Sequence, residues 1–423
     1  MNRMLRLAAL AVTLPAGMLP GIGAAQGPAA TAVAPPGTTI AVGNGVRDDL
    51  HAVWSRIVAA AGGPGARIVV FSASSGQPDL AAGQIIAALE AHGARAEHIR
   101  IGPLIPGSDP VAAVRDPAWI ARVDAATGVF FSGGRQDHLL DLLLPDGRST
   151  PLLDAVRGVW ARGGVVAGES AGAAVMSRIA FREMPSPLLA MKGRLDAGRE
   201  TGPGLGFLPE GVVVDQHFLA RGRIGRLLPL MVKLAQPLGL GVEENSAAVV
   251  RGDEVEVIGE QGVVVIDLAR ARVPEGLSAF GVQDARLSLL HAGDRFDLRT
   301  RRITPAAARA AAPVERSAPG FSGRIEGPGF FPDLLGPGVL AQAMAQAVDG
   351  QLAEVLGLSF AGQPEADDPA PDLGFEWRFK ADAASRGWGG ARGVYTLAQV
   401  RLDVRPVRMA RPLYTPWHAA PNR

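Results

Sequence analysis

The chain has 423 residues, of which 48% are hydrophobic and 20% are charged, a balance typical of a globular protein with a substantial core. Its formal net charge of +1 excludes the strong basic field that would attract nucleic acid or an anionic membrane. The absence of cysteine excludes disulfide bridges, thiol catalysis and lipid attachment through an N-terminal cysteine.

The first 25 residues have the layout of a secretory signal peptide. Arg3 and Arg6 give a positive start, a short apolar stretch follows, and Gly23 begins a small-residue cleavage site. Because the apolar stretch is short and interrupted by proline, we expect no stable membrane span once the peptide is removed. The sequence therefore predicts a periplasmic or extracellular protein, with a linker rich in Ala, Pro, Gly and Thr at residues 26–39.

Short apolar segments then alternate with helical patterns. Helices are predicted at 79–93 and 223–236, where apolar residues recur at helical spacing. The strand candidates are RIVVFSAS (67–74), AEHIRIG (96–102), TGVFFSGG (127–134), GVVAG (164–168), GVVVDQ (211–216) and GLGVEE (239–244). Strands separated by helices predict an α/β fold with a mostly parallel sheet that has helices on both faces.

The pattern changes toward the C-terminus. Residues 247–268 contain apolar runs joined by tight polar turns, so we expect added antiparallel strands. Residues 304–325 are rich in Ala and Pro and predict a second linker, which makes 40–303 the main domain. Residues 326–423 would form a small C-terminal α+β module, with a helix near 338–356 and hairpin strands after it.

The segment GVVAGESAGAAVMS places Ser170 between a buried strand and an Ala-rich helix. In such a strand-to-helix elbow, the small residues Gly168, Ala171 and Gly172 permit the sharp turn that exposes a nucleophilic hydroxyl. Unpaired N–H groups at the start of the helix could stabilise a developing oxyanion. A serine that only caps the helix would occupy the same position, so this segment alone leaves both interpretations open.

A nucleophilic serine needs a base and an acid that orients the base. Among the seven histidines, His217 follows the apolar strand GVVVDQ, and ligands of parallel sheets bind at the carboxyl ends of strands. Glu244 ends the next strand, 27 residues later, a spacing that fits one crossover helix and a return strand. We therefore expect Ser170, His217 and Glu244 at the same edge of one sheet. Their order along the chain differs from the Ser–acid–His order of α/β-hydrolases.

The segment DQHFLARGRIGR combines an acid with three arginines at the start of a predicted helix. Cations there oppose the helix dipole at a cost of about 0.3–1 kcal/mol each. Arg221, Arg223 and Arg226 therefore indicate a pocket for anionic groups, although an arginine-rich surface would give the same pattern. Asp215 supplies the opposite charge and is suited to binding a cation.

Four segments in this order resemble the cyanophycinase branch of the serine peptidases, which also include α-aspartyl dipeptidase. The segments are FFSGGRQ (130–136), GESAGAAVMS (168–177), DQHFLARGRIGRL (215–227) and GLGVEENSAAVV (239–250). The resemblance extends over roughly residues 40–300. It implies a flavodoxin-like fold related to class I glutamine amidotransferases, with Ser in place of Cys at the elbow. It also implies hydrolysis of cyanophycin, a poly-aspartate with arginine on each β-carboxyl, to β-aspartyl-arginine dipeptides, with no metal or organic cofactor.

By position, the resemblance implies that Ser170 is the nucleophile, His217 the base and Glu244 the orienting acid of an acyl-enzyme mechanism. The oxyanion hole would comprise the backbone N–H of Ala171 and that of Gly133 or Gly134. The residues that would line the substrate pocket are Gln136, Asp215, Gln216, Arg221, Arg223 and Arg226.

Glu169 departs from the family pattern, in which a small residue, often Thr, precedes the nucleophile. Its carboxylate could bind a substrate guanidinium, raise the pKa of His217, or point into solvent. We count it among the substrate-binding candidates. The same site could instead cleave short aspartyl or isoaspartyl peptides, and a disabled elbow would leave a non-catalytic exported binding protein. The expected partner is a polymer or peptide rich in Asp and Arg, and a homodimer is possible.

Overall fold

The computed structural model describes residues 37–414, apart from gaps at 45–48, 184–185, 278, 317, 365, 367 and 390–392. The predicted signal peptide (1–25) and most of the predicted linker (26–39) therefore lie outside the described residues. The described residues belong to one compact unit, Pro35–Arg423, which is built around two large sheets. Among the helices of the described ranges, none is long and apolar enough to cross a membrane.

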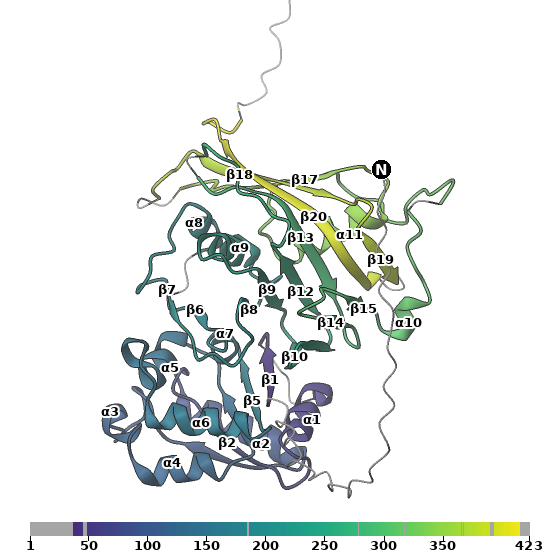
Figure 1. Cartoon of the computed structure of the whole chain (residues 1–423). Coiled ribbons are helices and arrows are strands. Elements are labelled where there is room, and N and C mark those ends of the chain that lie inside the picture. Colours follow the sequence, from purple (N-terminus) through teal and green to yellow (C-terminus); the bar gives the residue numbers. More distant parts are fainter. Residues whose placement is uncertain are drawn as a thin grey trace, which may run out of the picture. The chain divides into compact units, whose positions relative to one another are not determined.

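The first sheet contains the parallel strands. Within the described residues its nine strands lie in the order β15-β14-β11-β10-β1-β5-β4-β2-β3. Figure 1 labels β15, β14, β10, β1, β5 and β2 of this sheet. The parallel strands are β1 (Thr38–Val42), β2 (Arg67–Phe71), β3 (Arg95–Ile99), β4 (Gly128–Phe131) and β5 (Val165–Glu169). Counted from β2, the neighbours β3-β2-β4-β5 follow the 2-1-3-4 order of flavodoxin-like sheets. The predicted α/β fold with a flavodoxin-like sheet is confirmed.

Helices cover both faces of this sheet because successive residues of each strand point to opposite sides. In β2, Ile68 and Val70 pack in one buried cluster, and Val69 and Phe71 pack in another. The helices of the first cluster are α1 (His51–Ala60) and α2 (Pro78–Ala91). Those on the second side are α4 (Pro117–Asp124), α5 (Gln136–Leu143) and α6 (Pro151–Ala161), with the short α3 (Pro110–Ala113) and the 3-10 helix η1 (Pro145–Gly147) beside them.

Antiparallel strands extend the first sheet beyond β1, as the pattern of residues 247–268 predicts. They are β10 (Ser246–Arg251), β11 (Glu254–Gly259), β14 (Arg295–Asp297) and β15 (Ile303–Thr304). The next strand of the predicted run, β12 (Val263–Asp267), leaves this sheet and pairs with β9 and β13 of the second one.

The second sheet is mainly antiparallel, with order β16-β17-β18-β20-β13-β12-β9-β8 and β19 paired to β20. Its strands are β8 (Val212–Gln216), β9 (Leu238–Val242), β12, β13 (Val282–Leu290), β16 (Phe330–Phe331), β17 (Val355–Ser359), β18 (Leu373–Lys380), β19 (Arg386–Gly389) and β20 (Tyr395–Arg408). Its apolar side packs on α8 (Pro187–Met191), α9 (Ile224–Lys233) and α11 (Val339–Asp349). A small separate sheet pairs β6 (Ile179–Phe181) with β7 (Thr201–Pro203).

The expectation that the three candidate catalytic groups share one sheet edge needs correction. Ser170 follows β5 of the first sheet, whereas His217 and Glu244 follow β8 and β9 of the second. The two sheets meet here because only three residues separate β9 from β10. The backbone of Gly43 joins them, since its N–H donates to Ser246 (2.9 Å) and its C=O accepts from His217 (3.2 Å). The groups therefore converge at a junction of two sheets.

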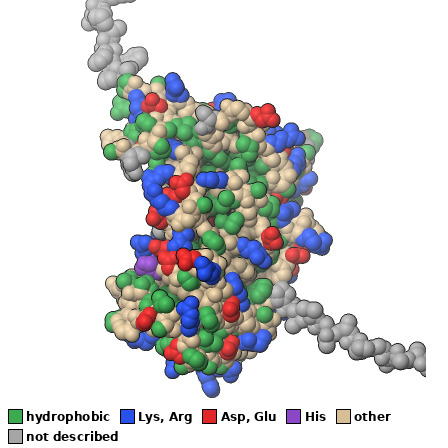
Figure 2. Space-filling view, turned by 60° about the vertical axis from the view of Figure 1, so that its left-hand side comes forward, with side chains coloured by type: hydrophobic (Ala, Val, Ile, Leu, Met, Phe, Trp, Pro, Cys, Tyr) green, Lys and Arg blue, Asp and Glu red, His purple; other side chains and the backbone are tan. Residues whose placement is uncertain are grey.

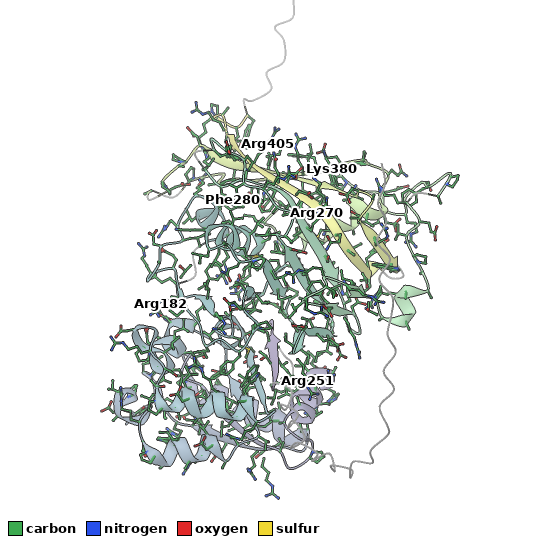
Figure 3. All side chains as sticks on the ribbon, viewed as in Figure 1. Arg182, Arg251, Arg270, Phe280, Lys380 and Arg405 are labelled. Carbon is green, nitrogen blue, oxygen red and sulfur yellow. The ribbon has the colours of Figure 1, made fainter. Side chains whose placement is uncertain are left out.

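The C-terminal part also differs from the separate module that composition predicts. β20 pairs with β13 on one side and with β18 on the other, so strands from both sides of 304–325 share one sheet. The predicted linker holds the short helix α10 (Ala307–Ala310). Lys380 of β18 and Arg405 of β20 mark the charged face of this sheet (Figure 3). The described residues of 326–414 thus belong to the same compact unit as His217, because β20 provides hydrogen-bond partners for the backbone of β13.

Charged side chains are mixed over the surface. Figure 2 shows Lys and Arg interspersed with Asp and Glu on the face that it draws, in keeping with the net charge of +1. That face therefore presents no single-sign field of the kind that attracts nucleic acid.

Candidate active site

Ser170 occupies a strained elbow between β5 and the short helix α7 (Ala171–Ala174). Its backbone has φ 49° and ψ −114°, a conformation that costs a non-glycine residue on the order of 1–3 kcal/mol. Glycine is required beside it, since a Cβ on Gly172 would lie 2.2 Å from the carbonyl oxygen of Phe131. The hydroxyl makes no capping hydrogen bond to α7, so the interpretation of Ser170 as a simple helix cap does not describe this geometry.

The Ser170 hydroxyl contacts His217 instead. Its Oγ lies 3.0 Å from His217 Nε2, and His217 Nδ1 lies 2.5 Å from Glu244 Oε1. Because a carboxylate only accepts, Nδ1 carries the proton and Nε2 is left to accept from the serine. The three residues that were predicted to act together therefore form one hydrogen-bonded array, defined here as the Ser170–His217–Glu244 array.

The imidazole of His217 is tuned toward its neutral form. Burial is the main cause of a pKa below the ordinary value, and the positive charges of Arg221 and Arg223 lower it further. The hydrogen bond and charge of Glu244 act in the opposite direction but do not outweigh them. A neutral imidazole near pH 7 is the form that can accept a proton from a hydroxyl.

Glu243 supports the array from behind and was missed by the sequence analysis. Its Oε2 accepts the backbone N–H groups of Leu219 and Ala220, the latter at 3.0 Å. These two residues follow His217 closely, so the carboxylate fixes the turn that leaves the candidate base. The signal was the adjacent pair of glutamates at the end of β9, but a sequence does not show which glutamate faces the imidazole.

Two of the three predicted oxyanion-hole residues border the nucleophile. Ala171 follows it directly at the start of α7, and a Cβ on Gly133 would lie 3.2 Å from Cβ of Ser170. Gly134 packs elsewhere: its φ is +134°, and a Cβ there would come within 2.1 Å of the carbonyl oxygen of Ser74. Gly134 thus shapes the loop after β4, and Gly133 is the better placed donor.

Glu169 turns toward the same place. Its Cγ lies 3.8 Å from the Cβ position of Gly133, and its carboxylate accepts a hydrogen bond from the Gly133 backbone N–H. Burial raises the pKa of Glu169, and the hydrogen bond from Gly133 offsets only part of that rise. Of the three predicted alternatives, pointing into solvent does not describe this side chain.

The predicted charged pocket is largely an internal ion-pair cluster. Asp215 is fully buried and receives two hydrogen bonds from Arg226, at 2.7 and 2.5 Å, while Arg223 approaches to 3.4 Å. Burial acts to raise the pKa of Asp215, but the two guanidinium groups outweigh it and the pKa is lowered. Burial also lowers the pKa of Arg223 to about 10. Asp215 therefore binds the arginines of its own chain, which differs from the expectation that it grips a substrate cation.

The remaining predicted pocket residues fall into two groups. Arg221 is exposed, and its backbone N–H donates to the carbonyl of His217 (3.1 Å). Gln136 and Gln216 are buried, and the side-chain Oε1 of each has no hydrogen-bond partner among the described residues. The amide nitrogen of Gln136 donates to the carbonyl of Phe181 (2.7 Å). Two unpaired acceptors in a buried region are costly unless a ligand or water satisfies them.

A second serine–histidine contact lies at the end of β2. Ser72 Oγ is 2.6 Å from His98 Nε2, and His98 Nδ1 is 3.5 Å from Asp79. Ser72 is fully buried, and its residue lies on the regular strand-end backbone rather than at a positive φ. An inaccessible hydroxyl cannot serve as a nucleophile, so this contact provides an internal control for Ser170.

Comparison with known proteins identifies the family of this chain. Residues 44–258 match the model of peptidase family S51. The chain is 31% identical over 283 residues to a cyanophycinase from Trichormus variabilis, covering 64% of this chain and 89% of the relative. It is 30% identical over 273 residues to a cyanophycinase from Geminocystis herdmanii, covering 62% and 94%.

Among solved structures, that of a peptidase from an acI-B1 Actinobacterium aligns over 63% of this chain and 98% of that chain, with 20% identity and a TM-score of 0.44. The family match itself ends at residue 258, so most of the second sheet lies beyond it. The resemblance inferred from the four sequence segments is confirmed: the chain belongs to peptidase family S51 and is a serine-type peptidase.

Proposed function

We propose that this protein hydrolyses cyanophycin to β-aspartyl-arginine dipeptides through an acyl-enzyme. The observation that carries the proposal is the Ser170–His217–Glu244 array at a strained elbow. The similarity to proteins named cyanophycinase supports the choice of substrate.

In the proposed reaction, Ser170 Oγ forms a bond to the α-carbonyl carbon of an aspartyl residue while Nε2 of His217 takes the hydroxyl proton. The carboxylate of Glu244 holds the Nδ1 proton and stabilises the imidazolium. The C–N bond then breaks and the imidazolium gives its proton to the leaving amine. Water, deprotonated by the same imidazole, then forms a bond to the ester carbon, and the imidazolium returns the proton to Ser170 Oγ as the ester C–O bond breaks.

The backbone N–H groups of Ala171 and Gly133 are the proposed donors to the tetrahedral oxyanion. Removing one such donor typically costs about 10²–10³ in kcat, so their availability matters. Because Glu169 accepts from Gly133, the substrate oxygen has to displace its carboxylate or meet it protonated. In the proposed reaction, Glu169 and the substrate oxygen therefore compete for the N–H of Gly133.

The charges beside His217 suit an acidic substrate. Arg223 and Arg226 are buried and bind Asp215, whereas the exposed Arg221 is close enough to His217 to lower the pKa of its imidazole. The guanidinium of Arg221 can bind a free carboxylate of an aspartate backbone. The unpaired amide oxygens of Gln136 and Gln216 are acceptors that suit the guanidinium N–H groups of the attached arginines.

The direct test is to incubate the purified protein with cyanophycin and to identify released dipeptides by mass spectrometry. We expect dipeptide release, its loss in Ser170→Ala, and its retention in the control Ser72→Ala. A parallel panel of aspartyl and isoaspartyl dipeptides tests the other substrate class. Turnover of that panel without polymer cleavage would contradict the proposed substrate, and polymer cleavage by Ser170→Ala would contradict the mechanism.

We also propose that the protein is exported. The support is the layout of residues 1–25, with a positive start, an apolar stretch and a small-residue cleavage site. Expression in a Gram-negative host followed by fractionation and N-terminal sequencing is the test. We expect the periplasmic or secreted chain to begin near Gln26; an uncleaved chain confined to the cytoplasm would overturn the proposal.

A further inference from the structure

A large cavity lies behind the candidate active site, on the side of Glu243. Its volume is about 780 Å³, and its walls come from the turn after His217, from α11 and from the segment before β16. Leu219, Ala220 and Glu243 belong to the part of the chain that matches the peptidase family, whereas Glu326 and Gln346 belong to the C-terminal part beyond it. The cavity therefore has walls from the C-terminal part of the chain and from Glu243 and the turn that follows His217.

The side-chain amide of Gln346 lines this cavity. Gln346 is 3% exposed as a whole residue, and its amide atoms are not among the buried polar atoms that lack a hydrogen-bond partner in the described part of the chain. The amide is open because its neighbour across the cavity is Gly327: a Cβ there would lie 3.2 Å from Oε1 and 3.4 Å from Nε2. An amide that lines a cavity offers both donors and an acceptor to a polar ligand.

The charged groups of the walls are predominantly acidic. Glu243 and Glu326 line the cavity and, in the described residues, neither forms an ion pair. Arg324 is the basic counterpart, but its Nε already donates to the buried Asp349 at 2.7 Å. Burial and the nearby Arg309 lower the pKa of His291, another wall residue, to about 4, so it is neutral at pH 7 and does not repel a cation.

The remaining walls are apolar or supply amides. Leu289, Ile325, Phe331, Ala341 and Ala345 provide apolar surface, and Gln342 adds a second amide next to Gln346. Carboxylates and amide oxygens suit the planar fork of a guanidinium, and the apolar walls suit the methylene chain that carries it. A compact inorganic anion or cation would leave the apolar walls unused.

We infer that this cavity is a second binding site, which takes a guanidinium on a methylene chain, namely an arginine side chain of the substrate polymer or of the released dipeptide. The choice of arginine rests on the proposed function. Because Glu243 both lines the cavity and holds the N–H groups of Leu219 and Ala220, a cation bound there lies next to the carboxylate that fixes the turn after His217.

The first experiment measures binding alone and needs no turnover. Isothermal titration of the Ser170→Ala protein with L-arginine is compared with L-citrulline, which has nearly the same shape and a neutral ureido group. We expect citrulline to bind at least tenfold more weakly. Equal affinity for the two ligands would overturn the inference, whatever the outcome of the cyanophycin assay.

Two substitutions localise the site. Glu326→Gln removes a wall charge from an exposed residue, and Gly327→Val fills the space in front of Gln346. We expect each to weaken arginine binding at least fivefold, while the exposed control Glu275→Gln leaves it unchanged. Unfolding midpoints verify that the variants are folded. Arginine affinity that survives both substitutions would place the ligand elsewhere and overturn the inference.

A third measurement identifies the source of the guanidinium. Cosedimentation of the Ser170→Ala protein with insoluble cyanophycin is compared with calorimetric titration of β-aspartyl-arginine, each with and without Gly327→Val. Loss of cosedimentation in the variant supports docking of the polymer, and loss of dipeptide binding supports a product site. If Gly327→Val changes neither, the cavity does not bind arginine.

Discussion

Glu243 and Glu244 are neighbours in the chain whose carboxylates hold opposite sides of the same histidine. Glu244 accepts the Nδ1 proton of His217 at 2.5 Å, and Glu243 accepts the N–H groups of the turn that follows it. One residue therefore orients the ring and the other orients the backbone. The arrangement follows from their place at the end of β9, where alternate side chains point to opposite sides.

Glu244→Gln should lower kcat by about 10⁴-fold, the loss that the equivalent acid-to-amide change causes in another serine peptidase. The amide can donate as well as accept, so it no longer fixes the Nδ1–H tautomer. Glu243→Gln is the matched variant: its amide oxygen still accepts from Ala220, so we expect a much smaller loss of kcat. Steady-state kinetics on cyanophycin compares them, and equal losses would contradict the assignment of the orienting acid to Glu244.

The value of kcat/KM should rise with pH as His217 loses its proton, and this rise should occur below the ordinary pKa of a histidine. The base is the neutral imidazole, and burial together with Arg221 and Arg223 lowers the pKa of His217. Arg221→Gln removes one of the positive charges, so the acidic limb of the kcat/KM profile should move to higher pH. Arg251, at the far end of β10, provides an exposed control (Figure 3). A limb that does not move, or that moves equally in Arg251→Gln, would contradict this coupling.

Glu169→Thr should raise kcat/KM by about tenfold at pH 8, because it releases the N–H of Gly133 for the oxyanion. The gain in kcat/KM is expected to shrink at low pH. Burial raises the pKa of Glu169, so at low pH its carboxyl group is already protonated in the unsubstituted protein. Profiles of kcat/KM for both proteins test this. A loss of activity on substitution, confined to KM, would show instead that the carboxylate binds the substrate.

Asp215→Asn should destabilise the fold by about 3–5 kcal/mol, because it removes the carboxylate that pairs with the buried Arg226 and Arg223. Asp141→Asn breaks the more exposed ion pair with Arg182 and should cost less than about 1 kcal/mol. The folded-state pKa of Asp215 is lowered, so its contribution is present above the ordinary value of 3.8 and is lost as the pH falls below it. Urea unfolding at pH 7 and pH 3 measures both effects; equal costs for the two substitutions would contradict the burial argument.

The sequence was sufficient to find the groups that follow strand ends, because hydrophobic runs and glycines mark where each strand stops. Ser170, His217 and Glu244 were located in this way, and the flavodoxin-like strand order agrees with the expected class. What the pattern could not show is pairing between distant segments. Three residues after β9 suffice to move the chain from one sheet to another, and nothing in their composition distinguishes this step from a hairpin.

The same limit applies to the charges. Asp215 and Arg226 are eleven residues apart, and their types fit a substrate pocket as well as they fit an internal ion pair. Only the burial of both, which depends on β8 packing against α9 and its neighbours, decides between these roles. Whether a polar side chain binds a substrate or forms an internal ion pair is therefore decided by the tertiary structure.

Deletion of residues 326–423 should abolish folding, although composition predicts that they form a separate module. β13 would lose its partner β20 along one whole edge, and buried residues such as Trp377, Phe379 and Leu402 would leave the apolar cluster that also contains Leu227 and Met231 of α9. An exposed apolar strand edge favours aggregation, so we expect insoluble protein. A soluble, active fragment that ends at residue 325 would show that the catalytic part folds without the second sheet's C-terminal strands.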